Sequence, residues 1–280
     1  MIEASAVSMK LLSYARKVGV NHQMLLIRFF HERFLYRVSL SEFRTHLLLK
    51  GGNLLYATQG KLARPTIDID FSGIHLSNDA REIEAIFKQI LTIHVKDAVV
   101  FNADTLMCHA INEQNQYTGI RIKVVAQLGS IRQNIQIDIG YGDVITPEPM
   151  VLHYPVLLEE FDVPVIYACS METVIAEKLQ AIIALAQLNS RMKDFYDIYT
   201  LINAHAIDYQ IQKEAIIQTF SNRNTALNFE TVVFTADFYE HENLKNMWKA
   251  FLKKINGEDI AFGTVVNRIE NFVKETFNEA

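Results

Sequence analysis

An alternation of apolar and polar side chains across residues 98–143 constrains the fold of this chain more than any other feature. Apolar side chains at every second position indicate a strand, because successive residues of a strand point to opposite faces of the sheet. The alternation, with turns that contain Gly or Asn, predicts strands at residues 99–101, 106–111, 119–128 and 131–139. These strands need a partner layer, since one of their faces is apolar.

The segments before this stretch supply that layer. Apolar residues recur with helical spacing, which predicts helices at residues 5–19, 22–38 and 78–95. A short apolar run at residues 47–49 precedes Gly51 and Gly52 and a helix that starts near Asn53, and residues 66–72 alternate as a further strand. The first part of the chain therefore predicts a sheet with helices packed on it.

The pattern changes after Pro147 and Pro149, and beyond Ser170 almost every segment has helical spacing. The helices predicted there span residues 171–188, 192–203, 208–220, 242–255 and 259–277. We therefore expect an α+β protein, with a mixed-sheet domain at residues 1–168 and an all-helical subdomain at residues 169–280. The boundary between them falls near residues 165–170.

Composition narrows the class of protein. The 280 residues are 50% hydrophobic, which suits one large or two modest buried cores. Cys108 and Cys169 fit neither a metal nor a disulfide framework, and the chain starts without the features of a secretion signal. No run of eighteen apolar residues is present, so a membrane partner is not expected. The expectation is a soluble, cytoplasmic protein.

The net charge of −5 means that nucleic acid would have to meet a local basic patch. Candidates for such a patch are Arg28, Arg33, Arg37 and Arg44 near the start of the chain, and Lys245, Lys249 and Lys253 on one late helix. For both sets, a solvated helix face is the simpler interpretation.

Three aspartates carry the strongest chemical signal. Asp68 and Asp70 alternate with Ile67, Ile69 and Phe71, so a strand would place both acids on one face, about 6.6 Å apart. Asp138 lies on the polar face of another predicted strand, and the three acids together would suit a site for two divalent cations. Such a site activates an attacking hydroxyl and holds a triphosphate, with Mg²⁺ or Mn²⁺ as the metal. The alternative is an ordinary polar strand face.

The residues before the aspartates suggest a phosphate site. Lys50, Gly51, Gly52 and Asn53 lie between a strand and a helix, where glycines allow close approach of the backbone and the helix start offers unpaired N–H groups. Arg64, Pro65 and Thr66 then lead into the acids, and Arg64 could reach a phosphate or brace a carboxylate. We predict that this set binds the nucleotide, although a plain tight turn and a surface arginine remain open.

The helical half adds a second group of charges. Lys178 lies at the rim of the apolar stripe of its helix, where its stem can be buried while its ammonium neutralises phosphate. Asp194 and Asp197 flank the stripe of the next helix and could orient Lys178 or Arg191. The alternative is a helical hairpin with surface ion pairs.

These motifs together resemble the AbiEii/AbiGii-type nucleotidyltransferase toxins, which share the DNA polymerase β-like fold. The resemblance covers about residues 45–203 and rests on the order of five motifs: Lys50–Leu55, Arg64–Phe71, Ile137–Asp143, Glu177–Ala181 and Arg191–Tyr199. It implies that Asp68 and Asp70 bind the metal and that Lys178 and Asp194 are essential. The family often has Ser or Thr just after the glycine, where this chain has Gly52 and Asn53, and an amide could replace that hydroxyl.

The resemblance further implies a toxin of a bacterial toxin–antitoxin or abortive-infection (phage-defence) pair, with a cognate antitoxin as its partner. Its reaction would transfer a nucleotide from an NTP to RNA, with a tRNA 3′ end as the expected acceptor and pyrophosphate as the product. Two alternatives stay open: transfer to a protein hydroxyl, and a non-catalytic module that binds nucleotides.

Overall fold

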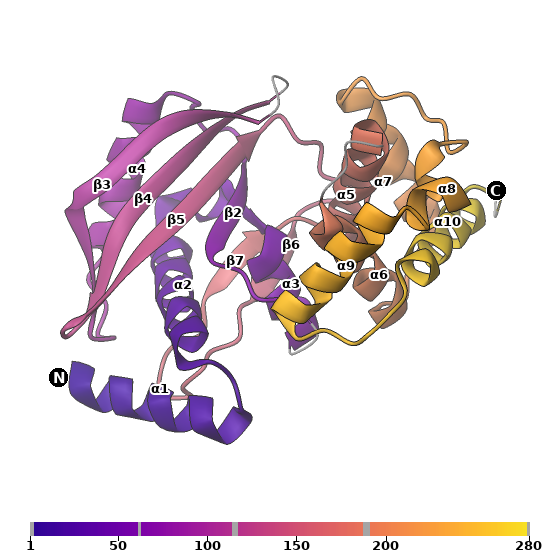
Figure 1. Cartoon of the computed structure of the whole chain (residues 1–280). Helices are drawn as coiled ribbons and strands as arrows, with labels where there is room; N and C mark the ends of the chain where they lie inside the picture. The colour runs from indigo at the N-terminus through magenta and orange to yellow at the C-terminus, as the bar shows by residue number, and fades with distance from the viewer. Residues whose placement is uncertain (1–2, 61–62, 114–116, 187–190, 279–280) are drawn as a thin grey trace. The chain divides into compact units, whose positions relative to one another are not determined.

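The computed structural model describes residues 3–60, 63–113, 117–186 and 191–278. It divides into two compact units (Figure 1). The first, called here the sheet unit, consists of Met1–Thr58, Pro65–Gly142 and Met150–Ala168. The second, the helical unit, consists of Gln59–Arg64, Asp143–Pro149 and Cys169–Ala280. Both units are therefore built from segments that are discontinuous in the sequence.

Seven strands in the described residues form one mixed sheet, in the order β3-β4-β5-β2-β1-β7-β6. Their bounds are β1 Leu47–Lys50, β2 Asp68–Gly73, β3 Val99–Glu113, β4 Tyr117–Leu128, β5 Ile131–Tyr141, β6 Met150–His153 and β7 Val165–Ala168. The pairs β2–β5 and β1–β7 are parallel, and the other neighbours are antiparallel. The α+β fold class expected from the sequence is confirmed.

Helices cover one face of this sheet. The helices of the first 92 residues are α1 Ala4–Val18, α2 His22–Leu40, the short 3₁₀ helix Glu42–Thr45, α3 Gly51–Gln59 and α4 Ala80–Thr92. In Figure 1, α2 and α4 lie behind β3, β4 and β5. Phe34 of α2 stacks on Phe87 of α4 and meets Phe71 and Phe101 of the sheet edge-on, and all four rings are buried. Burial of each such side chain stabilises the fold by about 1.5–3 kcal/mol.

The strand predictions are confirmed with two corrections. The segments predicted at residues 99–101 and 106–111 belong to one long strand, β3, whose pairing with β4 shifts register between Asn102 and Met107. The sequence pattern also missed β6 and β7, because each has only four residues and β7 joins β1 through a single paired position, Leu49 with Ala168. So short a run carries too little alternation to be recognised.

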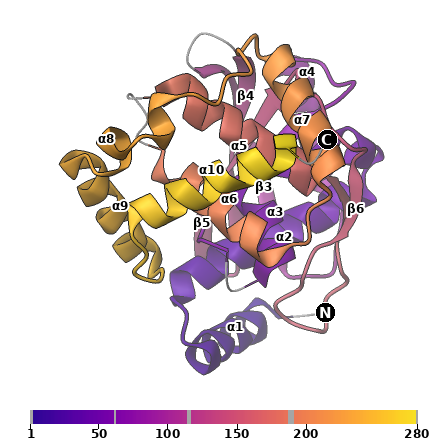
Figure 2. The same cartoon turned by 90° about the vertical axis from the view of Figure 1, so that its right-hand side faces the viewer.

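The helical unit consists of helices packed around aromatic side chains, and Figure 2 shows it turned toward the viewer. Its elements are α5 Met171–Leu185, α6 Met192–Ala204, α7 Tyr209–Asn222, the 3₁₀ helix Val232–Phe234, α8 Ala236–Tyr239, α9 Glu242–Ile255 and α10 Phe262–Asn278. Phe195 and Trp248 both contact Phe262, and the indole N–H of Trp248 donates to the carbonyl of Ile260. Among the described helices, none combines the length and the apolar character that crossing a membrane requires.

Two of the arginines considered for a basic patch are buried instead. The guanidinium of Arg37 donates to both carboxylate oxygens of Asp97, at 2.8 and 3.1 Å, and to the carbonyl of Val99. Arg33 pairs with Glu32 at 2.8 Å, and both side chains are almost fully buried. The basic-patch interpretation is therefore wrong for Arg33 and Arg37, because their acidic partners draw them into the interior. The Arg37–Asp97 pair fixes α2 to the start of β3.

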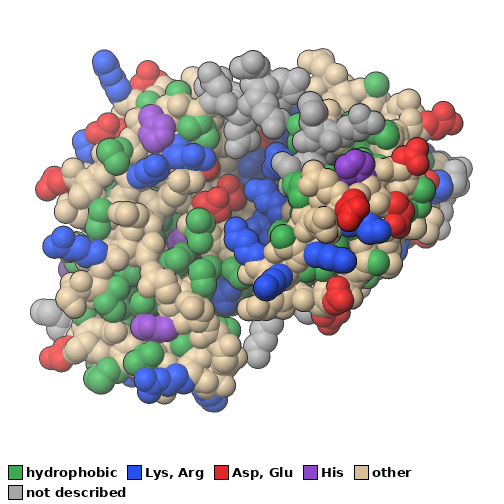
Figure 3. Space-filling model, in the orientation of Figure 1, with side chains coloured by type: hydrophobic (Ala, Val, Ile, Leu, Met, Phe, Trp, Pro, Cys, Tyr) green, Lys and Arg blue, Asp and Glu red, His purple; other side chains and the backbone are tan. Residues whose placement is uncertain are grey.

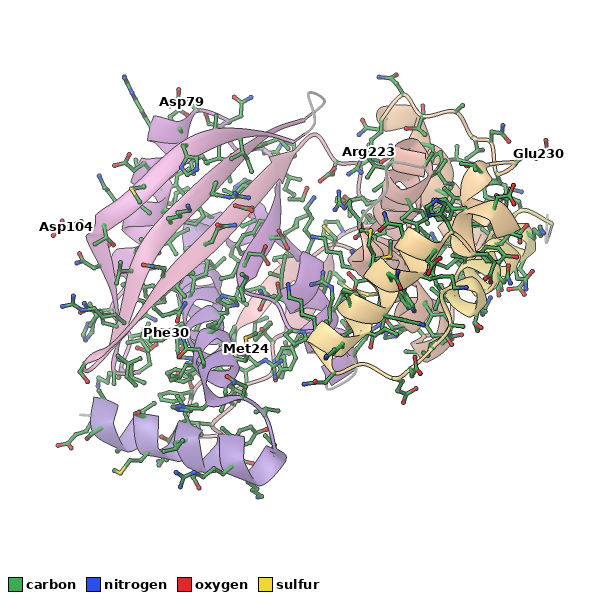
Figure 4. All side chains as sticks on the ribbon, in the orientation of Figure 1. Met24, Phe30, Asp79, Asp104, Arg223 and Glu230 are labelled. Atoms are coloured by element: carbon green, nitrogen blue, oxygen red, sulfur yellow. The ribbon has the colours of Figure 1, made fainter. Side chains whose placement is uncertain are left out.

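We predict that Asp97→Ala lowers the free energy of unfolding by about 3–5 kcal/mol, because it leaves Arg37 buried without its counter-charge. Chemical denaturation followed by circular dichroism measures the change. Asp104→Asn is the control, since Asp104 is exposed on β3, the strand that begins two residues after Asp97, and lies at the outer edge of that strand in Figure 4. The control should stay within about 0.5 kcal/mol of the native protein. Equal effects of the two substitutions would contradict the prediction.

Candidate functional site

Three aspartates of the sheet unit come together on the polar face of the sheet. Asp70 and Asp138 are direct neighbours on the parallel strands β2 and β5, and Asp68 lies two residues earlier on the same face of β2. One carboxylate oxygen from each lies within 4.8 Å of the other two, and all three residues are half-buried. We call these residues the carboxylate cluster. Oxygen ligands in this arrangement suit a hard divalent cation.

Like charges so close together repel one another. At an effective dielectric constant near 20, each pair of carboxylates about 5 Å apart costs on the order of 3 kcal/mol. A counter-charge beside the cluster lowers this repulsion. The three carboxylates therefore fit a metal ion. Lysine and arginine side chains near the cluster would also offset its negative charge.

The two glycines that begin α3 make room for the side chains of Asp70 and of Thr66, which neighbours the cluster. A Cβ at Gly51, where φ is +65°, would lie 2.0 Å from Oδ2 of Asp70. A Cβ at Gly52 would lie 2.5 Å from the Cβ of Thr66, whose hydroxyl donates to Asp68 at 2.6 Å. The helix start, where unpaired N–H groups favour negative charge, thus lies directly beside Asp70. That Gly51, Gly52 and Thr66 bind a nucleotide stays a prediction.

Asn53 links four parts of the sheet unit. Its amide nitrogen donates to the carbonyl of Asp68 at 2.7 Å, and its amide oxygen accepts from the hydroxyl of Tyr154 at 2.9 Å. The same oxygen lies 3.3 Å from Nδ1 of His31, and Asn53 is only 2% exposed. The amide therefore does not replace a phosphate-binding hydroxyl, which corrects that expectation. Only the backbone of Asn53 stays a predicted nucleotide contact.

Lys50 and Arg64 have different surroundings. Lys50 is paired with Asp70 in the register of β1 and β2, so it shares the face of the carboxylate cluster. The guanidinium of Arg64 donates to both oxygens of Asp197, at 3.0 and 3.1 Å. Of the two roles considered for Arg64, the structure shows the bracing of a carboxylate, and its contact with a nucleotide stays a prediction.

Arg64 belongs to a second group of charges, within the helical unit. Lys178 donates to Asp194 at 2.9 Å and to Asp197 at 2.8 Å, and Arg191 pairs with Asp194 at 2.7 Å. We call these five residues the lysine cluster. The two aspartates are 1% exposed and Lys178 is 12% exposed, so surface ion pairs are the wrong description of this hairpin.

The lysine cluster holds Lys178 and Asp194 in their charged forms. Burial alone would lower the pKa of Lys178, but Asp194 and Asp197 outweigh it and raise the pKa. Burial likewise opposes ionisation of Asp194, yet Lys178 and Arg191 hold its pKa below the usual range. With three cations and two anions, the cluster carries an excess positive charge that suits a phosphate ligand. The sequence suggested that Asp194 and Asp197 could orient Lys178 or Arg191, and the structure shows Asp194 in contact with both cations and Asp197 in contact with Lys178. An essential role for Lys178 and Asp194 stays a prediction.

Sequence reasoning missed Arg121. It lies opposite Asp138 in the register of β4 and β5, and its guanidinium donates to both oxygens of Asp138 at 2.8 and 2.7 Å. The signal was present, because β4 and β5 are joined by the two-residue turn Gly129–Ser130. So short a turn fixes the register, and counting outward from it pairs Arg121 with Asp138.

No continuous basic patch is visible on the described part of the outward sheet face. In the left half of Figure 3, which views the molecule as Figure 1 does, Lys and Arg side chains are scattered singly. Lys123 and Arg132 are exposed members of this face.

We predict that Gly51→Ala destabilises the protein more than Gly19→Ala does. Both positions have positive φ, and this strain costs about 1 kcal/mol in each case. A Cβ at Gly19 meets nothing within 4 Å, whereas one at Gly51 collides with Asp70, which adds about 1–3 kcal/mol. Chemical denaturation of both variants gives the difference, and equal losses would show that Asp70 moves aside freely.

The Asn53 network also predicts a dependence of stability on pH. Burial lowers the pKa of His31 from 6.5 to about 4, and its Nε2 is buried with no hydrogen-bond partner among the described residues. The unfolded chain takes up a proton at His31 between pH 6.5 and 4 that the folded chain does not, so His31 makes the protein less stable as the pH falls. The full effect is about 3 kcal/mol.

The neighbouring Glu32 acts in the opposite direction, because burial raises its pKa from 4.5 to about 7. The measurement is therefore the difference in unfolding free energy between the native protein and His31→Gln, since Glu32 is common to both. We expect the stability advantage of the native protein to decrease by about 3 kcal/mol from pH 7 to pH 4. A difference that stays constant across this range would refute the assignment to His31.

The family model for the nucleotidyl transferase AbiEii toxin of type IV toxin–antitoxin systems matches residues 33–273. The match extends beyond the motifs at residues 45–203 on which the resemblance rested. A comparison with curated proteins finds no match.

Two solved structures from Helicobacter pylori are similar to this chain. A candidate nucleotidyltransferase is 15% identical, with 93% of this chain and 97% of that chain covered and a TM-score of 0.53. A second protein, JHP933, is 14% identical, with 92% and 97% covered and a TM-score of 0.47. The first of these supports the fold alone. Because the family model spans most of its length, the chain belongs to the AbiEii family of nucleotidyltransferase toxins.

Proposed function

We propose that this nucleotidyltransferase moves a nucleotide from an NTP to the 3′ end of an RNA, with tRNA as the acceptor, and that the reaction requires a divalent metal ion. One observation carries the proposal: three carboxylates from two parallel strands converge within 4.8 Å on the polar face of the sheet. Family membership supports the reaction class, and the acceptor is inferred from the family resemblance.

The chemistry is an in-line displacement at the α-phosphorus of the NTP. A bond forms between the 3′ oxygen of the acceptor and the α-phosphorus, and the bond from that phosphorus to the oxygen bridging the β-phosphate breaks. Pyrophosphate leaves, and the hydroxyl proton passes to a carboxylate of the cluster or to water. Mg²⁺ or Mn²⁺, held by Asp68, Asp70 and Asp138, would supply positive charge for the hydroxyl and the triphosphate.

The residues around the cluster support its geometry. Thr66 holds one oxygen of Asp68, and the start of α3 places positive partial charge beside Asp70. Holding ligands in fixed positions matters because catalysis of phosphoryl transfer relies mainly on positioning and electrostatic stabilisation. Lys178 and Asp194 are proposed as essential residues of the lysine cluster, whose excess positive charge suits phosphate groups.

A cognate antitoxin is the proposed protein partner, in keeping with the type IV toxin–antitoxin family, and defence against phage is the proposed setting. Comparing the four labelled NTPs in a transfer assay would identify the nucleotide that the protein uses. Transfer to a protein hydroxyl is a different outcome of the same assay.

The test incubates the purified protein with Mg²⁺ and each of the four NTPs labelled at the α-phosphate, together with total tRNA. We expect label in RNA with the native chain and at least about a hundredfold less with Asp70→Asn, because the variant loses charge at the cluster. Asp104→Asn, exposed on β3 of the same sheet, should transfer normally. Removal of Mg²⁺ with EDTA should abolish transfer as well.

Three outcomes would count against the proposal. Undiminished transfer by a folded Asp70→Asn protein would exclude the carboxylate cluster as the metal site. Label found only in protein, after incubation with a total lysate, would favour the protein acceptor. NTP binding without release of pyrophosphate under any condition would favour a module that binds nucleotides without turnover.

A further inference from the structure

Asp138 of the carboxylate cluster is covered by an arginine. Nε and Nη2 of Arg121 donate to Oδ1 and Oδ2 of Asp138, at 2.8 and 2.7 Å, and the amide of Gln136 reaches Oδ2 at 3.3 Å. Arg121 lies on β4, directly across from Asp138 in the strand pairing. The side chains are 32% and 14% exposed, so the pair is partly shielded from water.

The paired hydrogen bonds from Arg121 to Asp138 have two consequences for a cation at the cluster. A guanidinium stays charged at every accessible pH and matches a carboxylate with two parallel hydrogen bonds. It therefore supplies positive charge to a cluster that would otherwise hold three negative charges within 4.8 Å. It also takes one lone pair on each oxygen of Asp138, which a metal ion would otherwise be able to use.

We propose that Arg121 is a built-in counter-ion of the carboxylate cluster and the positioning residue of Asp138. It stabilises the cluster while no metal is bound, and it competes with the divalent cation for Asp138. This inference rests on the proposed function, since it takes the cluster as the metal site. An ordinary surface ion pair, in contrast, contributes little to stability and leaves metal affinity unchanged.

If Arg121 competes with the cation, its loss should change stability and metal affinity in opposite directions. Loss of the guanidinium should weaken the metal-free protein, because Asp138 loses its paired cation and the repulsion among the three carboxylates increases. The same loss should strengthen cation binding, because Asp138 loses two competing hydrogen bonds and a nearby positive charge is gone. A residue with a purely structural role would weaken both.

The test compares Arg121→Gln with the matched control Lys123→Gln. Lys123 lies on the same strand and face, two residues along β4 and opposite Gln136, and it is exposed. Free Mn²⁺ is measured by electron paramagnetic resonance during titration, without nucleotide and at constant ionic strength. We expect the Mn²⁺ dissociation constant to fall about tenfold for Arg121→Gln and to stay near the native value for Lys123→Gln.

Thermal unfolding provides the second readout. In EDTA, Arg121→Gln should melt below the native protein, and the gap should narrow when Mn²⁺ is added. Arg121→Lys keeps the charge but loses the planar fork, so its Mn²⁺ affinity should lie between those of the native protein and Arg121→Gln. This variant keeps the test decisive even where Arg121→Gln fails to fold.

Unchanged or weaker Mn²⁺ binding by Arg121→Gln would overturn the inference, as would an equal gain in Lys123→Gln. Absence of Mn²⁺ binding by every variant would overturn it too. Failure of the proposed function is separate, because it is scored by label transfer: tighter Mn²⁺ binding by Arg121→Gln, with no transfer by the native protein, would uphold the counter-ion and reject the reaction.

Discussion

The carboxylate cluster depends on the hydrogen bonds of one buried amide, that of Asn53. This side chain fixes the first turn of α3 to the backbone of Asp68 and to the hydroxyl of Tyr154. The bond to Asp68 leaves the carboxylate of that residue available, because it uses the main-chain oxygen. With α3 held in this way, Gly51 and Gly52 lie against Asp70 and Thr66, where any larger residue would collide. The packing of the start of α3 and the positions of the aspartates therefore depend on each other.

Strand pairing then brings in the third acid. Asp138 meets Asp70 because β2 and β5 run parallel, although the two residues are 68 positions apart in the sequence. The antiparallel pairing of β5 with β4 places Arg121 at the same level. A negative cluster and its balancing cation are therefore both set by strand register, and the register is specified by the buried apolar face on the other side of the sheet.

Much of this arrangement follows from local sequence patterns. Alternation identified the strands that carry Asp68, Asp70 and Asp138, and helical spacing placed Lys178 and Asp194 on neighbouring helices. The pairing of Arg121 with Asp138 was equally accessible, since it needs only a two-residue turn and counting. Local patterns fail where a contact spans a long stretch of chain. Tyr154 lies 101 residues from Asn53, and no periodicity marks that contact. Arg37 resembled a surface residue because its partner, Asp97, is 60 residues away.

The discontinuous makeup of the helical unit limits how this protein can be dissected. Residues 169–280 would seem a natural fragment to express alone, yet several of their partners come from earlier in the chain. Arg64 pairs with Asp197, and Asp143 pairs with Arg223, which Figure 4 labels. A cut at residue 168 would remove the arginine that pairs with Asp197 and the nearer of the two carboxylates that pair with Arg223, which would keep only Glu177 at 3.6 Å. A truncated product would thus report on a damaged interior, and point substitutions in the intact chain are the sounder tool for assigning roles to the helices.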